Sequence, residues 1–191
     1  MVVQSDEELC RKVAEHDAAA FEALLGRHQA RAFRLACSIL GSEADARDVS
    51  QDAFIRLFES AGKFDGRSRF STWFYRIVVN LCIDHKRRNK WWRRMVSFSN
   101  PDDDPDSPPV DPPSSEPGPE AAAIGAQAGR RLRVALEGLS PAQRAAVLLQ
   151  TDEDLSGREI AEILECSEST ARVHIHRALA HLKKTMKEPD R

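Results

Sequence analysis

Basic and aromatic residues gather in two stretches of this sequence, where they could contact nucleic acid. Residues 85–94 (HKRRNKWWRR) place six Lys and Arg around Trp91 and Trp92. Lys and Arg neutralise phosphates, and aromatic rings stack on bases or wedge beside them. Further along, an expected helix from residue 168 carries groove-facing candidates early in its length, namely Ser169, Arg172, His176 and Arg177. Because Arg can donate two hydrogen bonds to guanine O6 and N7, the sequence predicts a protein that reads DNA.

Each stretch also has a simpler interpretation. The bases of residues 85–94 could be a solvated helix end, where the helix dipole favours cations, with the two tryptophans covering a hydrophobic core. The pattern near residue 170 would also arise in a plain helical hairpin with a charged surface. Composition alone therefore leaves both alternatives open.

The side chains that enzymes and metal sites need do not cluster in the sequence. The four cysteines are far apart and form no CxxC pair, so we expect neither a disulfide framework nor a zinc site, and we favour a reducing cytoplasm. His174 and His176 would point about 200° apart on a helix, and no acidic or cysteine partner follows at metal-ligand spacing. The sequence has no phosphate-cradling glycine loop and no nucleophile elbow. We therefore expect no catalytic residue, metal, cofactor or small-molecule substrate, and an enzyme is the least favoured class.

The net charge of −2 hides three blocks of different charge. Residues 1–95 hold 17 Lys and Arg against 13 Asp and Glu, and residues 121–191 hold 11 against 10. Residues 96–120 hold 7 acids, no Lys or Arg, and eight of the ten prolines, which exclude helix interiors. This composition predicts a flexible linker between two domains at 1–95 and 121–191. Besides a plain tether, the anionic strip could lie in a basic channel of a partner.

Apolar residues at three- and four-residue spacing predict a four-helix domain in residues 1–95. One stripe runs over residues 9–25 and a second over residues 32–40, where Gly41 ends it. Ser42 then begins a helix that should bury one face: Ala46, Val49, Ala53, Phe54, Leu57 and Phe58. A loop at residues 63–69 leads to a long helix, which Ser71 or Thr72 is expected to cap.

Residues 121–191 are predicted to hold a helix over 121–139 and three further helices. Ser140 and Ser156 each precede a Gln or Glu by three residues, which is the capping-box start signal. A short helix at 157–164 and a helix at 168–184 flank a three-residue turn, an arrangement typical of helix-turn-helix units. We expect these two helices to pack through Ile160, Ala161, Leu164, Val173 and Leu179. The expected fold class is therefore all-α, with two small helical domains joined by a flexible acidic linker.

Taken together, four segments resemble bacterial RNA polymerase sigma factors of the extracytoplasmic-function (ECF) group. They are residues 45–58 (DARDVSQDAFIRLF), 70–88 (FSTWFYRIVVNLCIDHKRR), 139–149 (LSPAQRAAVLL) and 156–184 (SGREIAEILECSESTARVHIHRALAHLKK). The resemblance covers both domains in their order. It implies a sigma region 2 domain at 1–95, a helix-turn-helix region 4 domain at 121–191, and a protein that joins core RNA polymerase and directs promoter recognition, DNA melting and transcription initiation.

The same resemblance implies roles for single residues. Those that would bind the clamp of core polymerase are Asp48, Gln51 and Asp52. Those that would contact the minus-ten element are Lys63, Phe64, Arg67, Asn80, Lys86, Arg87 and Arg88. Asn80 suits capture of a flipped base, because an amide offers both a donor and an acceptor. Those that would read the minus-35 element are Ser169, Arg172, Val173, His176 and Arg177. Without the resemblance, solvent-exposed helix surface would explain the acidic set and Asn80 equally well.

The implied partners are core RNA polymerase, promoter DNA and an anti-sigma protein. We expect control to come from a separate sequestering chain, which in this family is often membrane-anchored, so the protein itself is expected in the cytoplasm or held at the inner membrane by that chain. The acidic linker would thread towards the RNA path of the polymerase. Glu165 occupies a turn position where many family members have Gly, and a positive φ there would cost about 1 kcal/mol.

A stand-alone helix-turn-helix repressor is the main alternative class. It would bind a palindromic site as a dimer without polymerase, yet the sequence shows no obvious dimer helix or ligand pocket. A sigma factor instead opens DNA by capturing bases, and each stacked step costs about 1.4 kcal/mol to separate. A free sigma factor is therefore expected to bind promoters weakly, and the holoenzyme tightly.

Overall fold

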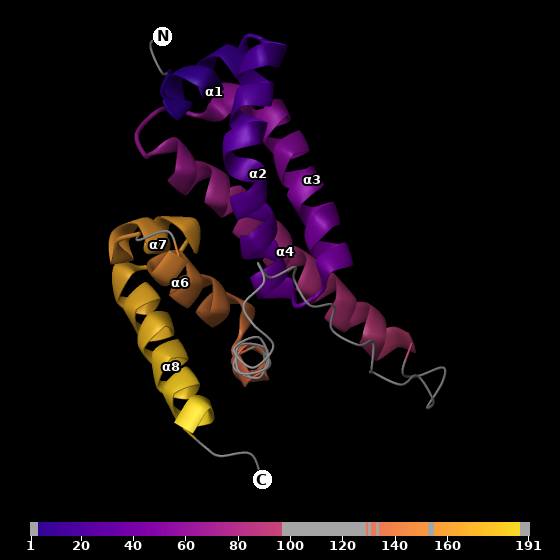
Figure 1. The fold of residues 1–191 in the computed structure, drawn as a ribbon, viewed down its shortest axis with the longest axis vertical. Helices are drawn as coiled ribbons and strands as arrows, with labels where there is room; N and C mark the ends of the chain where they lie inside the picture. Colours follow the sequence, from indigo (N-terminus) through magenta and orange to yellow (C-terminus); the bar gives the residue numbers. More distant parts are fainter. Residues whose placement is uncertain (1–3, 97–128, 130, 133, 153–154, 188–191) are drawn as a thin grey trace, which may run out of the picture.

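The computed structural model describes residues 4–96, 129, 131–132, 134–152 and 155–187, and the regular structure in these ranges is helical. Apart from Val96, the predicted linker at 96–120 lies outside the described residues. Of the helix expected at 121–139, residues 129, 131–132 and 134–139 are described; those up to 137 are helical, and residues 138 and 139 form a turn and a bend. Figure 1 shows two groups of helices, α1–α4 from the first part of the chain and α6–α8 from the last.

The N-terminal group contains α1 (Asp6–Ala14), α2 (Ala18–Leu40), α3 (Glu43–Ser60), the short 3-10 helix η1 (Ala61–Lys63) and α4 (Phe70–Val96). The domain has four α-helices, as predicted. The boundary between the first two differs from the prediction, because the apolar stripe over residues 9–25 is divided between α1 and α2. His16 adopts a positive φ of 65°, which stops α1. Asp17 then accepts a hydrogen bond from the Ala20 N–H at 3.1 Å and begins α2.

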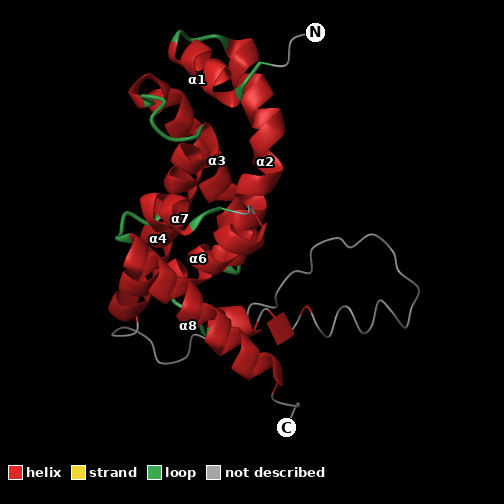
Figure 2. Cartoon of the chain, turned by 90° about the vertical axis from the view of Figure 1, so that its left-hand side faces the viewer, coloured by secondary structure: helices red, strands yellow, loops and turns green. Residues whose placement is uncertain are grey.

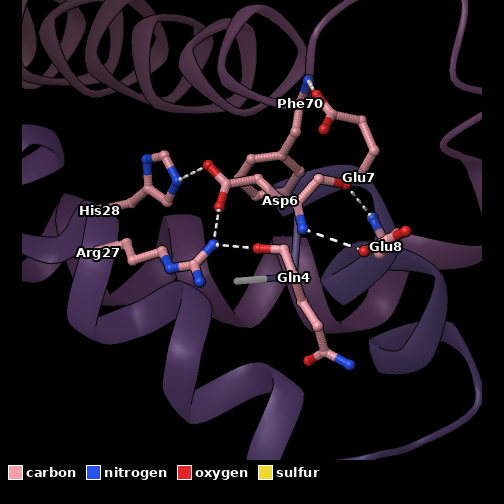
Figure 3. Close-up of polar contacts among 8 residues, drawn as sticks. Gln4, Asp6, Glu7, Glu8, Arg27, His28 and Phe70 are labelled. Carbon is pink, nitrogen blue, oxygen red and sulfur yellow. Dashed lines mark hydrogen bonds and ion pairs between the residues drawn. The ribbon is translucent and has the colours of Figure 1, made fainter. Parts of the chain in front are cut away.

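The start of α4 is held by a residue that lies 63 positions earlier in the chain. The Phe70 N–H donates to the Glu7 carboxylate at 3.0 Å (Figure 3). The prediction that Ser71 or Thr72 would cap this helix is therefore wrong, and the Thr72 hydroxyl is buried without a hydrogen-bond partner. The cap could not be predicted from local spacing, because α1 supplies it.

Aromatic rings form the centre of the N-terminal group. Phe70 and Phe74 are fully buried and nearly parallel, with ring centroids 5.8 Å apart, and Phe54 of α3 lies 4.9 Å from Phe74. Most of the predicted face of α3 is buried as expected, but Phe58 is 42% exposed. Its ring lies beside those of Phe21 and His16, with centroids 5.6 Å and 5.8 Å away.

The C-terminal group contains α6 (Pro141–Asp152), α7 (Gly157–Ile163) and α8 (Glu168–Lys187). Both predicted capping boxes are present: Ser140 exchanges hydrogen bonds with Gln143, and Ser156 exchanges them with Glu159. The predicted packing of α7 on α8 is partly wrong. Val173 and Leu179 are 44% and 46% exposed. The buried residues of α8 are instead Ala171, Ile175 and Ala178.

The two groups of helices pack against each other. α7 contacts α4, and α6 contacts both α2 and α4 (Figures 1 and 2). Buried residues of α6, α7 and α8 belong to the same hydrophobic cluster as the core of α1–α4, among them Leu149, Ile160 and Ile175. The two units that the sequence separates by a linker are therefore in direct contact.

Candidate protein and nucleic-acid interfaces

One face of α3 carries the residues that the sequence assigns to a protein partner. Asp48, Gln51 and Asp52 are all exposed, at the three- and four-residue spacing that puts side chains on one face of a helix. Ile55 continues this face and is 56% exposed. In Figure 1, α3 lies on the side of α2 opposite α6–α8, so the C-terminal group leaves this face uncovered. Sequence reasoning missed Ile55 because it looked only for polar residues, although Ile55 follows Asp48 by seven positions.

A polar hollow of about 340 Å³ lies beside the loop that precedes α4. Its lining comes from the loop, from α4 and from α7: Lys63, Asp65, Arg67, Ser68, Trp73, Arg76, Arg158 and Glu162. The loop is folded back on itself, because the Arg67 N–H donates to Asp65 at 3.0 Å and Gly66 has a positive φ of 72°. Four cations against two carboxylates make this hollow suited to an anionic ligand such as a DNA backbone.

Two predicted minus-ten residues differ in their placement around this hollow. Asn80 is half-buried on α4, one helical turn beyond Arg76. Phe64 instead points into the aromatic core, with its ring centroid 5.4 Å from Trp73 and 6.1 Å from Phe70. Arg76 was missed by sequence reasoning, although its position four residues before Asn80 places both on one face.

The remaining predicted minus-ten residues lie further along α4. Arg87 and Arg88 are exposed, Lys86 is half-buried, and Arg87 pairs with Asp84 of the same helix at 3.0 Å. His85 reaches Asp45 of α3 at 3.3 Å and so joins the basic end of α4 to the start of α3. α4 continues through Trp91 and Trp92, whose side chains lie outside the described part of the chain.

The predicted minus-35 residues share one exposed face of α8. Ser169, Arg172, Val173, His176 and Arg177 are all exposed, and the buried stripe of this helix lies on its other side. Ser167 caps the helix by accepting from the Thr170 N–H at 3.2 Å. Arg172 is held by Glu168 at 2.5 Å, one turn earlier. The helix therefore presents two arginines, a histidine and a hydroxyl to solvent, the groups that read base edges in the major groove.

Polar contacts cross between the two groups of helices at Asn80, Arg69 and Arg144. The Asn80 side-chain amide donates to the Glu165 carboxylate at 3.3 Å, and Arg69 lies 3.7 Å from Glu159. The Arg144 guanidinium, which is 2% exposed, donates to the Ile39 carbonyl at 3.0 Å at the C-terminal end of α2. Burial lowers the pKa of Arg144, against the opposing attraction of Glu137. Helix C-termini attract cations, so α6 supplies a cap to α2.

The described ranges contain neither a metal-binding cluster nor a membrane-spanning helix. Within them, no group of three or more His, Cys, Asp or Glu side chains could hold a metal ion. No helix in those ranges is long and apolar enough to cross a bilayer. Burial raises the pKa of Cys10 to about 11 and that of Cys82 to about 12.

Both groups of helices match known protein families. Residues 24–92 match Sigma-70 region 2, and residues 129–182 match Sigma-70 region 4. The ECF RNA polymerase sigma factor SigM of Mycobacterium tuberculosis is 31% identical over 183 residues, which cover 96% of this chain and 85% of SigM. The ECF RNA polymerase sigma-E factor of Haemophilus influenzae is 30% identical over 175 residues, 91% of each chain. The ECF RNA polymerase sigma factor SigW of Bacillus subtilis is 27% identical over 178 residues, 93% of this chain and 95% of SigW.

Two solved structures share the fold. CnrH, in complex with the cytosolic domain of CnrY, has a TM-score of 0.64 at 23% identity, over 96% of this chain and 97% of that chain. The sigma factor RpoE, in complex with the anti-sigma factor NepR from Bartonella quintana, has a TM-score of 0.68 at 20% identity, over 89% of this chain and 98% of that chain.

Proposed function

This chain belongs to the ECF family of RNA polymerase sigma factors, and we propose that it binds three partners through three separate helix faces. The partners are core polymerase, the minus-ten element and the minus-35 element. The proposed domain boundaries are 1–95 for region 2, 96–120 for the linker and 121–191 for region 4. The observation that carries the proposal is that region 2 and region 4 matches occur in order, each with an exposed face of suitable chemistry.

The α3 face is the proposed contact with core polymerase. Asp48, Gln51 and Asp52 supply charge and amide groups, and Ile55 supplies an apolar contact one turn beyond Gln51 and Asp52. Protein interfaces commonly join a desolvated apolar centre to a polar rim. Exposure of all four residues on one helix face supports this role, because a partner can reach them together.

The face around the polar hollow is the proposed minus-ten contact. Lys63, Arg67 and Arg76 would neutralise phosphates, and the Asn80 amide would accept and donate to the edge of an unstacked base. We assign Phe64 a positioning role, because its packing against Trp73 fixes the loop from the core side. Further along α4, Lys86, Arg87 and Arg88 would follow the backbone of the opened DNA.

The exposed face of α8 is the proposed minus-35 contact. Arg172 and Arg177 would bind guanine edges or phosphates, and Ser169, Val173 and His176 would fit the neighbouring positions in the major groove. To reach a base, Arg172 must leave Glu168, so recognition exchanges an ion pair for hydrogen bonds to the base edge.

A further part of the proposal concerns control. Of the two solved structures of this fold, one holds the sigma factor RpoE with the anti-sigma factor NepR, and the other holds CnrH with the cytosolic domain of CnrY. We assign this chain an anti-sigma partner of the same kind, with action in the cytoplasm, where core polymerase and DNA are. Co-purification of this chain from cells tests this part: an anti-sigma protein should accompany it, and recovery of core polymerase alone would contradict it.

Transcription from a template library tests the main proposal. Templates with randomised minus-35 and minus-ten elements are transcribed by purified core polymerase with and without this chain, and the run-off products are sequenced. We expect one promoter sequence to be enriched only with the chain, and Asn80→Ala to lower its transcript about tenfold, since a base-specific contact contributes about 1–3 kcal/mol. Gln29→Ala, which removes an exposed amide from α2, is the matched control and should not lower it. Failure to enrich any sequence above core polymerase alone would contradict the proposal.

A further inference from the structure

The loop at residues 63–69, part of the proposed minus-ten face, joins η1 at one end and α4 at the other. Within the loop, Arg67 bonds to Asp65 through its N–H at 3.0 Å and its guanidinium at 3.2 Å. At the first end, the Phe64 N–H donates to the Ala61 carbonyl of η1 at 3.1 Å. At the other end, the loop leads directly into α4. The position of the loop therefore depends on what holds η1 and the start of α4.

Helix α1 holds both ends of this loop. It packs against η1, where Ala61 is 3% exposed. It also contacts the start of α4, where the Glu7 carboxylate accepts from the Phe70 N–H at 3.0 Å (Figure 3). α4 has no acidic residue in its own first turn, so Glu7 supplies the negative charge that a helix N-terminus favours. One helix from an earlier part of the chain therefore sets where the loop begins and where it ends.

α1 is itself anchored to the rest of region 2. Its buried residues belong to the main hydrophobic core. Asp6, the neighbour of Glu7, binds α2 through Arg27 at 2.6 Å and His28 at 2.7 Å (Figure 3). Two consecutive carboxylates of α1 thus reach two different helices. The region 2 match begins at residue 24, so α1 lies outside it and the match assigns this helix no role.

We propose that α1 is a positioning element for minus-ten recognition and that Glu7 is its positioning residue, which holds the loop at residues 63–69 in the form that receives DNA. The proposal rests on the function assigned to that loop above. Binding groups act well only when they are held close to their productive geometry. The first N–H groups of a helix have no partner within the helix, so loss of the Glu7 cap releases the first turn of α4 and the loop before it. Affinity for DNA then falls with the fraction of molecules in which the loop is in place.

A cap that did nothing but stabilise the fold would leave DNA binding unchanged. A typical domain stays almost fully folded after the loss of one helix cap. The number of folded molecules, and with it the affinity for each partner, would then equal that of the parent. Release of the loop instead weakens the minus-ten contact and leaves the α3 and α8 faces as they were.

Hydrogen–deuterium exchange in the full-length chain tests the tether without DNA. We expect Glu7→Ala to speed exchange of the Phe70 amide about fivefold, the effect of one net hydrogen bond, and to speed exchange of the loop amides with it. Glu7→Gln keeps an oxygen that can accept from the Phe70 N–H, and its exchange should stay close to that of the parent. Unchanged exchange at residues 64–70 in Glu7→Ala would overturn the tether.

Ser42→Ala is the matched control. It removes the N-cap of α3, where the Ser42 hydroxyl accepts from the Asp45 N–H at 3.3 Å. Ser42 follows the far end of α2, a helix of 23 residues whose first residues lie next to α1. The variant therefore loses a helix cap of the same domain at a distance from the loop, and exchange at residues 64–70 should not change.

Binding by the holoenzyme tests recognition itself. One probe is a single-stranded oligonucleotide with the minus-ten sequence enriched in the transcription test, and the other is a duplex that carries the enriched minus-35 element without the minus-ten element. Glu7→Ala should bind the first probe about fivefold more weakly than the parent, by the same loss of one net hydrogen bond, and the second equally tightly. Glu7→Gln and Ser42→Ala should bind both probes like the parent.

The outcomes separate this proposal from the one on which it rests. Minus-ten affinity of Glu7→Ala equal to that of the parent, or an equal loss in Ser42→Ala, would overturn the positioning role while the proposed function stands. If the parent enriches no promoter, the proposed function has failed, and the exchange measurement still decides whether Glu7 holds the loop.

Discussion

Two neighbouring carboxylates near the N-terminus tie three helices together (Figure 3). Asp6 binds Arg27 at 2.6 Å and His28 at 2.7 Å on α2, and Glu7 caps α4 through the Phe70 N–H. His28 is buried against the Phe70 ring, with centroids 5.1 Å apart. These contacts fix the start of α4, and α4 carries Asn80 and the basic residues that follow it.

Removal of the Glu7 cap should destabilise the protein without changing any proposed contact residue. We expect Glu7→Ala to lower the free energy of unfolding by about 0.5–2 kcal/mol, the usual effect of losing a helix cap. Glu7→Gln retains a carboxamide oxygen that can accept from the Phe70 N–H, and it should lose much less. Urea unfolding followed by circular dichroism measures both, and equal losses would contradict the assigned role of the cap.

The same carboxylates make stability depend on acid. Burial raises the pKa of Asp6, but hydrogen bonds from Arg27 and His28 outweigh it and hold the pKa below the ordinary 3.8. The Phe70 N–H lowers the pKa of Glu7 below 4.5. Because both native pKa values are lowered, the stabilisation is complete above about pH 5.5 and is lost as the pH falls through them. Between pH 7 and pH 3, the free energy of unfolding should fall less steeply in the double variant Asp6→Asn/Glu7→Gln than in the parent. An equally steep fall would contradict this origin of the acid sensitivity.

Buried thiols should be chemically inert in the folded protein. The raised pKa values of Cys10 and Cys82, about 11 and 12, leave almost no thiolate at neutral pH, and thiolate is the reactive form. We expect iodoacetamide at pH 7.5 to modify neither residue in the native protein and both in 6 M guanidinium. Peptide mass spectrometry measures the modification, and rapid native labelling of Cys82 would show that the core opens readily.

At the scale of a helix, one face of α3 packs in the core and the opposite face is the proposed binding surface. Its buried face holds the core, and Ile55 on the other face is exposed. We expect Ile55→Ser to weaken binding to core polymerase about tenfold, since burying an Ile side chain contributes about 1.5–3 kcal/mol. The unfolding midpoint should hardly change, because exposed positions contribute little to stability. Titration of labelled core polymerase measures the first effect, and an unchanged affinity would remove Ile55 from the interface.

Local signals in the sequence predicted the helices and their exposed faces well. The capping boxes at Ser140 and Ser156 and the exposed set on α8 each depend on residues a few positions apart. Contacts between distant segments could not be predicted in this way. The Glu7 cap of α4 and the burial of Arg144 join residues 63 and 105 positions apart. Sequence reasoning identified Glu165 as unusual, and the structure confirms its positive φ, but its partner Asn80 emerged only from the packing of the two groups.

At the scale of the whole molecule, the proposed contact faces lie on two groups of helices that pack against each other. In this structure α7 packs against α4, which carries the proposed minus-ten residues, and the proposed minus-35 face of α8 is exposed. Capture of one or two bases offsets only part of the free energy of melting, at about 1.4 kcal/mol for each stacked step, so we expect core polymerase to supply the rest.

Promoter affinity with and without core polymerase tests this account most directly. A labelled duplex promoter from the transcription test is titrated with the free chain and with the holoenzyme at several salt concentrations. We expect the holoenzyme to bind at least about 100-fold more tightly, with an affinity that falls steeply with salt because phosphate contacts release counterions. Equal affinity and equal sequence preference of the free chain would contradict the account.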